Sequence, residues 1–343
     1  MTLLPAKFYF QAMPELRQNI ITRHWVIIAT ERARRPHEFS RKEERRPLPH
    51  RVPNCPFCTG NEEKTPAETL RIPGDGNWRV RVFPNRFPAL AAAGEIMRAH
   101  TGIKRAITGV GIHEVVVETP DHGQTLSSMS NTEVEQVIEA YLQRHKAALS
   151  NPIVEHVTIF KNHGAAAGTS LEHPHSQLIA TPIIPSEVRE RLENALRFYD
   201  DNGRCIFCFT LEEEAREDTR VVDENPHFLA FVPYAALSPY HLWIFPKRHC
   251  ASFGCIGDEE KDALAQILRR SLVRLDKRLN NPDYNFVVRT APKESETVRY
   301  YHWYITVVPR VSQTAGFELG SGMFINTSLP EESARFLADV KVD

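Results

Sequence analysis

Two sets of cysteines and histidines in this chain have the residue types and the spacing of metal ligands. They are Cys55, Cys58, His122 and His173 in the first set, and Cys205, Cys208, His249 and His302 in the second. The interval from His122 to His173 is 51 residues, and that from His249 to His302 is 53. Two thiolates and two imidazoles suit a tetrahedral zinc ion, and four protein ligands leave no open position for a substrate. The pattern predicts two structural zinc sites and an internal duplication.

Other interpretations of these residues stay open. A Cys-x-x-Cys pair also occurs in redox proteins, although the flanking βαβ pattern of thioredoxin-like chains is not found in this sequence. In the first set His113 competes with His122. We favour His122 because its context, a strand, a proline and then a histidine, is repeated at His249. Thiolates favour zinc in the second site, with iron as the other candidate. Cys250 and Cys255 are expected to be idle, buried thiols.

The two copies differ at the residue that can react. The first copy continues from His173 to His175 and Gln177, whereas the second has Tyr304 in the place of His175. Residues at i and i+2 on a strand point to the same face, so one histidine can bind metal while the next faces a substrate. A neutral imidazole is a good nucleophile toward phosphorus, and the Gln177 amide can hydrogen-bond a phosphoryl oxygen. The competing interpretations of His175 are a further metal ligand and an ordinary strand histidine.

A loop of small residues, 162–170, precedes this histidine pair. Glycine and alanine let backbone N–H groups approach a phosphate, and Ser170 adds a hydroxyl donor. The second copy has the segment 291–296 there, with two carboxylates and no glycine. Only the first half is therefore expected to hold a phosphate group.

Hydrophobic periodicity indicates the elements that must position these residues. Strands are expected over 25–29, 78–83, 113–118, 153–160, 176–181, 228–232, 242–245, 285–289 and 301–308. Helices are expected over 131–149, 186–199 and 258–279, with a short one from Pro330. Strands with one long helix in each half predict an α+β fold, with one mainly antiparallel sheet and helices packed on it. The duplication divides the chain into domains 1–195, the catalytic half, and 196–343.

Composition excludes several classes of protein. The chain has 343 residues and a net charge of −1, so no global field attracts it to nucleic acid or to an anionic membrane. It contains neither a run of 18 apolar residues nor a signal-peptide pattern, and we expect a cytoplasmic protein. The arginine-rich stretch 32–46 is either a solvated loop or a source of anion-binding side chains.

Residues 162–177, together with the pair Cys55 and Cys58, resemble the galactose-1-phosphate uridylyltransferase family of the histidine-triad superfamily. The similarity extends from Trp25 to Glu318, and the motif from His173 to Gln177 is highly specific. The resemblance implies two histidine-triad-like half-domains. It also implies ping-pong transfer of a nucleoside monophosphate between a nucleotide sugar and a sugar-1-phosphate, usually in a homodimer with active sites near the interface.

The resemblance also implies roles for individual residues. His175 matches the nucleophile, and Gln177 matches the residue that stabilises the phosphate. The expected nucleotide and substrate contacts are Arg32, Arg35, Asn85, Phe87, Asn162, Gly168, Ser170 and Glu318. Cys55, Cys58, His122 and His173 match the family's structural zinc set.

Some positions depart from the best-known members. Arg289 and Tyr304 stand where two metal-binding histidines occur in those members, and Ser312 and Phe324 replace two residues that contact the sugar phosphate. The second thiolate set instead resembles the plant ADP-glucose phosphorylase branch. The resemblance to the family as a whole makes UDP-hexose:hexose-1-phosphate uridylyl transfer the first hypothesis. The departures make ADP-glucose phosphorolysis the alternative. A histidine-triad hydrolase and a non-catalytic zinc-ribbon binding module are further alternatives.

Overall fold

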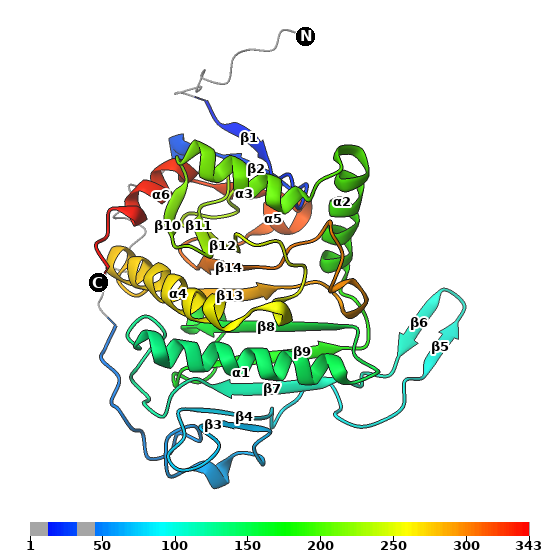
Figure 1. The fold of residues 1–343 in the computed structure, drawn as a ribbon, viewed down its shortest axis with the longest axis vertical. Helices are drawn as coiled ribbons and strands as arrows, with labels where there is room; N and C mark the ends of the chain where they lie inside the picture. Colours follow the sequence, from blue (N-terminus) through cyan, green and yellow to red (C-terminus); the bar gives the residue numbers. More distant parts are fainter. Residues whose placement is uncertain (1–12, 33–44, 343) are drawn as a thin grey trace.

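The computed structural model describes residues 13–32 and 45–342. Its central feature is a sheet of ten described strands in the order β10-β11-β12-β14-β13-β8-β9-β7-β4-β3 (Figure 1). Every neighbouring pair in this sheet is antiparallel. The strands are β3 (Leu70–Ile72), β4 (Val80–Pro84), β7 (Ile112–Val117), β8 (His156–His163), β9 (His175–Thr181), β10 (Val221–Glu224), β11 (Phe228–Phe231), β12 (Leu242–Pro246), β13 (Tyr284–Arg289) and β14 (Tyr304–Pro309). The expected α+β class with an antiparallel sheet is confirmed.

The strand order is the same on both sides of the central pair, β8 and β13. Outward from β8 the order is β9, β7, β4 and β3, and outward from β13 it is β14, β12, β11 and β10. The two halves meet where β8 pairs with β13, with Asn162 opposite Asn285. This repeated order fits the expected duplication. Residue 195 lies inside α2 (Ser186–Asn202), and the division of the chain there stays a prediction.

Two long helices, α1 (Asn131–Ser150) and α4 (Asp258–Leu279), lie side by side across one face of the sheet (Figure 1). At the start of α1 the Ser130 side chain accepts from the Glu133 N–H, and Glu133 accepts from the Ser130 N–H in return. The expected apolar stripe of α1, from Val134 to Leu142, is buried in the core beneath it. The remaining helices are α3 (Ile206–Glu217), α5 (Gly316–Ser321) and α6 (Pro330–Ala338). The sequence did not predict α3 or α5.

Alternation along β9 separates its core residues from its reactive ones. Leu178 and Ala180 belong to the core under α1 and α4. His175 and Gln177 therefore lie on the opposite face of the sheet. On that face the Phe57 ring packs against His175, with ring centroids 5.4 Å apart.

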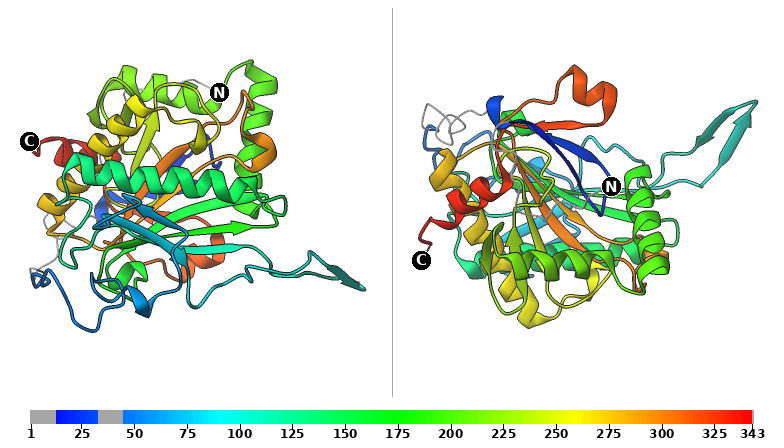
Figure 2. Two further views of the ribbon diagram at one scale, coloured as in Figure 1. Left: turned by 60° about the horizontal axis from the view of Figure 1, so that its bottom comes forward. Right: turned by 90° about the horizontal axis from the view of Figure 1, so that it is seen from above.

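Three smaller features complete the described chain. Strands β1 (Glu15–Gln18), β2 (Trp25–Ile28) and β15 (Phe324–Asn326) form a separate sheet. Strands β5 (Arg98–Thr101) and β6 (Lys104–Ile107) form a hairpin that projects from the body (Figure 2). Cys250 and Cys255, expected to be idle thiols, are joined as a disulfide, so that prediction was wrong. Among the described residues we find no helix with the length and apolar character of a membrane span.

Candidate active site

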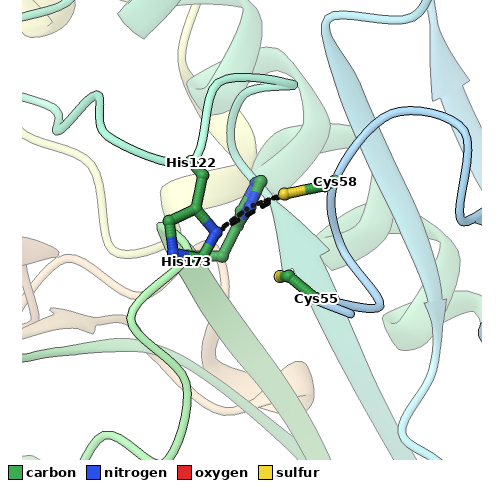
Figure 3. Close-up of side chains that lie close together, drawn as sticks. All are labelled: Cys55, Cys58, His122 and His173. Carbon is green, nitrogen blue, oxygen red and sulfur yellow. Dashed lines mark hydrogen bonds between the residues drawn. The ribbon is translucent and has the colours of Figure 1, made fainter. Parts of the chain in front are cut away.

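The first set of expected metal ligands comes together in three dimensions. The donor atoms of Cys55, Cys58, His122 and His173 all lie within 4.8 Å of one another. Figure 3 shows the four side chains pointing toward a common centre. The Nδ1 atoms of His122 and His173 are 3.5 and 3.6 Å from the Cys58 Sγ. This buried donor set can hold a metal ion, and it contains His122 rather than His113.

The protonation of His173 favours metal binding. Its Nε2 lies 2.8 Å from the Thr119 carbonyl oxygen, which can only accept, so Nε2 carries the proton and donates. The Nδ1 lone pair is then directed at the cluster. Burial lowers the pKa of His173 to about 4 and also lowers the pKa of His122. Both rings are consequently neutral near pH 7, the state in which imidazole binds metal.

The second half repeats this arrangement. The donor atoms of Cys205, Cys208, His249 and His302 also lie within 4.8 Å of one another. The His302 Nε2–H donates to the Pro246 carbonyl at 3.0 Å, as His173 does to Thr119, and its Nδ1 lies 3.6 Å from the Cys208 Sγ. A hydrogen bond from Cys208 lowers the pKa of the Cys205 thiol. A thiolate is therefore ready to bind a cation there.

His175 begins strand β9 and is oriented as a nucleophile. Its Nδ1 lies 2.9 Å from the His173 carbonyl oxygen, so Nδ1–H donates and the lone pair is on Nε2. Within the described part of the chain Nε2 has no hydrogen-bond partner, and the side chain is 8% exposed. Burial lowers the pKa of His175, which keeps the ring neutral and able to attack an electrophile.

A buried ion pair supports the strand that carries this histidine. The Lys161 ammonium lies 2.6 Å from a Glu118 oxygen, and their side chains are 1% and 0% exposed. Lys161 also donates to the His175 carbonyl at 3.3 Å. The other Glu118 oxygen accepts from the hydroxyls of Ser176 and Tyr141. The sequence pattern did not identify Lys161 or Glu118, because each lies at the end of a stretch that otherwise reads as an ordinary core strand.

The expected phosphate loop lies immediately beside the junction between the halves. Gly164 and Gly168 have φ values of +86° and +88°, which side chains rarely adopt. A Cβ on Gly164 would lie 2.3 Å from the Asp283 carboxylate. Asp283 accepts from the Ala166 N–H at 2.6 Å, and the Asn285 amide donates to the Asn162 side chain at 2.8 Å. The second half therefore holds the loop in place, a role that no spacing in the sequence indicated.

Arg45 also reaches this loop region. It forms an ion pair with Asp283, and its Nη1 lies 2.8 Å from the His163 Nε2. The arginine-rich stretch therefore contributes one structural cation. Ser170 is exposed at the end of the loop.

Gln177 has two neighbours on its face of the sheet. Its Oε1 lies 2.8 Å from the His113 Nε2 and 3.5 Å from the Asn85 Nδ2. Phe87, two residues after Asn85 in the sequence, is 83% exposed. The structure thus brings Asn85 to the reactive strand, and it places His113 there instead of at the metal cluster.

The other expected contacts lie apart from His175. Arg32 is exposed at the end of a short 3-10 helix, Thr30–Arg32. Glu318 accepts from the Ala315 N–H at 2.9 Å in α5, and this bond, with a smaller contribution from the Arg32 charge, lowers the pKa of Glu318. No contact within the described residues joins either side chain to His175. Arg35 lies outside the described residues.

Comparison with known proteins places this site in a family. A model described as galactose-1-phosphate uridyl transferase, N-terminal domain, matches residues 7–185, and a model of a domain of unknown function matches residues 110–340. ADP-glucose phosphorylase of Arabidopsis thaliana is 36% identical over 334 residues, covering 96% of this chain and 93% of that protein. Galactose-1-phosphate uridylyltransferase of Thermotoga maritima is 31% identical over 340 residues, covering 96% of this chain and 100% of that protein.

The solved structures agree. A crystal structure of an ADP-glucose phosphorylase from Arabidopsis thaliana with bound ADP-glucose has a TM-score of 0.83 at 32% identity, covering 96% of this chain and 100% of that one. A uridylyltransferase structure has a TM-score of 0.74 at 27% identity, covering 95% of this chain and 97% of that one. This chain therefore belongs to the galactose-1-phosphate uridylyltransferase family, and it is a nucleotidyltransferase.

Proposed function

We propose that this enzyme is an ADP-glucose phosphorylase that works through a nucleotidyl group on His175. The Nε2 lone pair attacks the α-phosphorus of ADP-glucose, the bond to the bridging oxygen breaks, and glucose-1-phosphate leaves. Inorganic phosphate then attacks the same phosphorus, the N–P bond breaks, and ADP is released. The observation that carries the chemistry is the His175 geometry, with Nδ1–H bound to a carbonyl and Nε2 free on the face shared with Gln177.

Similarity supports the choice of donor. The relative at 36% identity is an ADP-glucose phosphorylase, and a related solved structure contains ADP-glucose. This support favours the alternative over the uridylyl transfer that we placed first from the sequence. The uridylyltransferase of Thermotoga maritima, at 31% identity over 96% of this chain, keeps UDP-hexose as the second candidate donor.

The surrounding groups contribute positioning and electrostatic stabilisation, which supply most of the rate in phosphoryl transfer. The loop 162–170 presents backbone N–H groups and the Ser170 hydroxyl to the phosphates. The Gln177 amide donates to an oxygen of the reacting phosphoryl group as negative charge develops. The Lys161–Glu118 ion pair lies beneath the strand, where it supports the His175 backbone through the bond to its carbonyl without taking part in bond making.

The remaining assignments extend the same proposal. The two donor sets are suited to zinc, since thiolates and imidazoles prefer it. Bound zinc would fix the turn from Cys55 to Cys58 to the start of β9. Arg32 and Glu318, neither of which contacts His175 among the described residues, act together with Arg35 at the active site of a partner subunit in a homodimer. We also propose the division of the chain at residue 195 and a cytoplasmic location.

Intact-protein mass spectrometry tests the proposal. Zinc-loaded enzyme is mixed with ADP-glucose or with UDP-glucose, and His175→Ala serves as the control. We expect an AMP-sized increase in mass that the variant does not show, and its conversion to ADP after phosphate is added. A UMP-sized adduct that is discharged by a sugar-1-phosphate would move the enzyme to the uridylyl class. If the folded, metal-loaded enzyme forms neither adduct, the histidine nucleophile is wrong.

A further inference from the structure

His113 is a polar residue at the reactive strand for which the proposed chemistry has no role. It lies on β7, whose register with β9 places His113 opposite Ile179 and Val117 opposite His175. Opposed residues of an antiparallel pair share a face, so His113, Gln177 and His175 all lie on the same side of the sheet. His113 is on the far side of Gln177 from His175. This placement lets it contact Gln177 without touching the nucleophile.

The hydrogen bonds of His113 determine which ring nitrogen carries the proton. The Ala89 backbone N–H lies 3.0 Å from Nδ1. A peptide N–H can only donate, so Nδ1 must be the accepting nitrogen and the neutral ring carries its proton on Nε2. Nε2 is 2.8 Å from the Gln177 Oε1. The bond therefore runs from the His113 Nε2–H to the carboxamide oxygen of Gln177.

Asn85 is oriented by the backbone in the same manner. Its Oδ1 accepts from the Phe87 N–H at 2.9 Å, which turns its amide nitrogen toward His113 and Gln177, 3.1 Å from the His113 Nε2 and 3.5 Å from the Gln177 Oε1. The Asn85 N–H also donates to the His113 carbonyl at 2.8 Å, which attaches this loop to β7. The His113 Nε2–H is thus the principal donor to the Gln177 oxygen, and the Asn85 amide nitrogen lies beside this bond.

The other end of the carboxamide is available. Within the part of the chain that the structure describes, the Gln177 Nε2 has no hydrogen-bond partner, and the side chain is only partly buried. With Oε1 held by the His113 Nε2–H, the NH2 group must face away from it. A rotated carboxamide would instead present its oxygen to the anionic oxygens of a phosphoryl group, and these would repel each other.

We propose that His113 is a positioning residue: its Nε2–H holds the Gln177 carboxamide so that the NH2 group points to the phosphoryl group that His175 attacks. The proposal rests on the proposed function, because it assigns His113 to the same nucleotidyl transfer. His113 does not contact the reacting atoms itself. Its effect on the rate passes entirely through Gln177.

Three substitutions separate this role from a structural one. His113→Gln places an amide N–H near the position of the imidazole Nε2. His113→Asn keeps an acceptor for the Ala89 N–H but is too short to reach Gln177. His113→Leu removes both contacts. His100→Leu, on the exposed strand β5, is the matched control. Each variant is checked for metal content and for its circular dichroism spectrum.

The assay is the single-turnover rate of nucleotidyl-His175 formation over a range of donor concentrations, by rapid quench and intact mass. Removing a direct oxyanion donor costs on the order of 100- to 1000-fold, so loss of its orientation should cost about 10- to 100-fold. We expect this loss in the maximal rate for the Asn and Leu variants, with the half-saturating donor concentration unchanged. His113→Gln should recover most of the rate.

A double-mutant cycle with Gln177→Ala gives the decisive comparison. If His113 acts only through Gln177, adding His113→Leu to Gln177→Ala should not slow the reaction further. Equal losses in both backgrounds, or a Gln variant as slow as the Leu variant, would overturn the proposal. So would an effect confined to the half-saturating concentration. If the unsubstituted enzyme forms no adduct, the proposed function fails first, whereas a normal adduct with unaffected variants refutes His113 alone.

Discussion

Replacing Lys161 with methionine should unfold this protein at a markedly lower denaturant concentration. The side chain is 1% exposed, and its ammonium lies 2.6 Å from Glu118, which is itself fully buried. The substitution leaves the Glu118 carboxylate without a cation, with only the hydroxyls of Ser176 and Tyr141 as donors. Removing one partner of a buried ion pair typically costs about 3–5 kcal/mol. Loss of the bond to the His175 carbonyl adds about 1 kcal/mol.

The expected decrease in the free energy of unfolding is therefore about 4–6 kcal/mol. Urea titrations of metal-loaded protein, followed by circular dichroism and tryptophan fluorescence, measure it from the shift of the midpoint and the slope. The matched control is Lys161→Met combined with Glu118→Gln, which removes both charges and keeps an acceptor for the hydroxyls. This double variant should be more stable than Lys161→Met by about 1–3 kcal/mol. A single variant that loses less than about 1 kcal/mol, as surface pairs do, would refute the reasoning.

Three further predictions follow from the metal clusters, the core and the loop. Cys205→Ser should remove one metal ion per chain, measured by plasma mass spectrometry, and leave adduct formation nearly intact, whereas Cys58→Ser should remove the other ion and also slow the adduct. Burial lowers the pKa of His145 in the folded protein to about 3, from its ordinary value of 6.5. Below pH 6.5 the unfolded chain therefore binds a proton that the folded protein does not, and the free energy of unfolding decreases as the pH drops from 6.5 toward 3. His145→Phe should abolish this component, about 2 kcal/mol between pH 7 and pH 5 in denaturant titrations; an unchanged acid dependence would contradict it. Gly164→Ala, made in the His175→Ala background, should weaken binding of the nucleotide-sugar donor at least about tenfold in titrations. The added Cβ would displace Asp283, and a positive φ at this position is strained for alanine. Unchanged affinity would mean that the loop does not hold the phosphates.

The sequence predicted those parts of the fold that depend on local periodicity. The helix expected over 131–149 is α1, Asn131–Ser150, and the one expected over 258–279 is α4. The helix α3 was missed, because the hydrophobic periodicity predicted no helix or strand between residues 199 and 228. In the structure Cys205 is the residue before α3 and Cys208 lies in its first turn. Two pairs with identical spacing thus occupy different local structures, and the spacing alone does not distinguish them.

Contacts between distant segments account for what the sequence could not predict. Nothing in the pattern of the second half indicates that Asp283 and Asn285 hold a loop of the first half, because this follows only from the pairing of β13 with β8. His113 did carry a usable signal. It alternates with Val115 and Val117 on its strand, so it shares their face, but the identity of that face is set by the β7–β9 register. Cross-strand register is a property of the folded sheet.

The duplicated halves have kept one metal-binding arrangement and have divided the other tasks. His173 and His302 each donate Nε2–H to a backbone carbonyl and direct Nδ1 at the thiolates. Two residues later, on the same face of the sheet, the first half has His175 whereas the second half has Tyr304. The Tyr304 ring packs against Trp243 and Phe245, with centroids 5.2 and 4.7 Å away, so an apolar cluster fills the place of a reactive site.

The loss of chemistry in the second half coincides with a gain in support for the first. Asp283 and Asn285 lie in the second half at the start of β13. Asp283 accepts from the Ala166 N–H, and the Asn285 amide donates to the Asn162 side chain and to the Ala167 carbonyl. The phosphate loop therefore depends on contacts that the first half cannot make alone, because the Asp283 carboxylate and the Asn285 amide both come from the second half. A single half could bind metal and present a histidine, but its loop would lack the groups that hold it in place. The duplication is thus part of the active site, even though only one half carries the nucleophile.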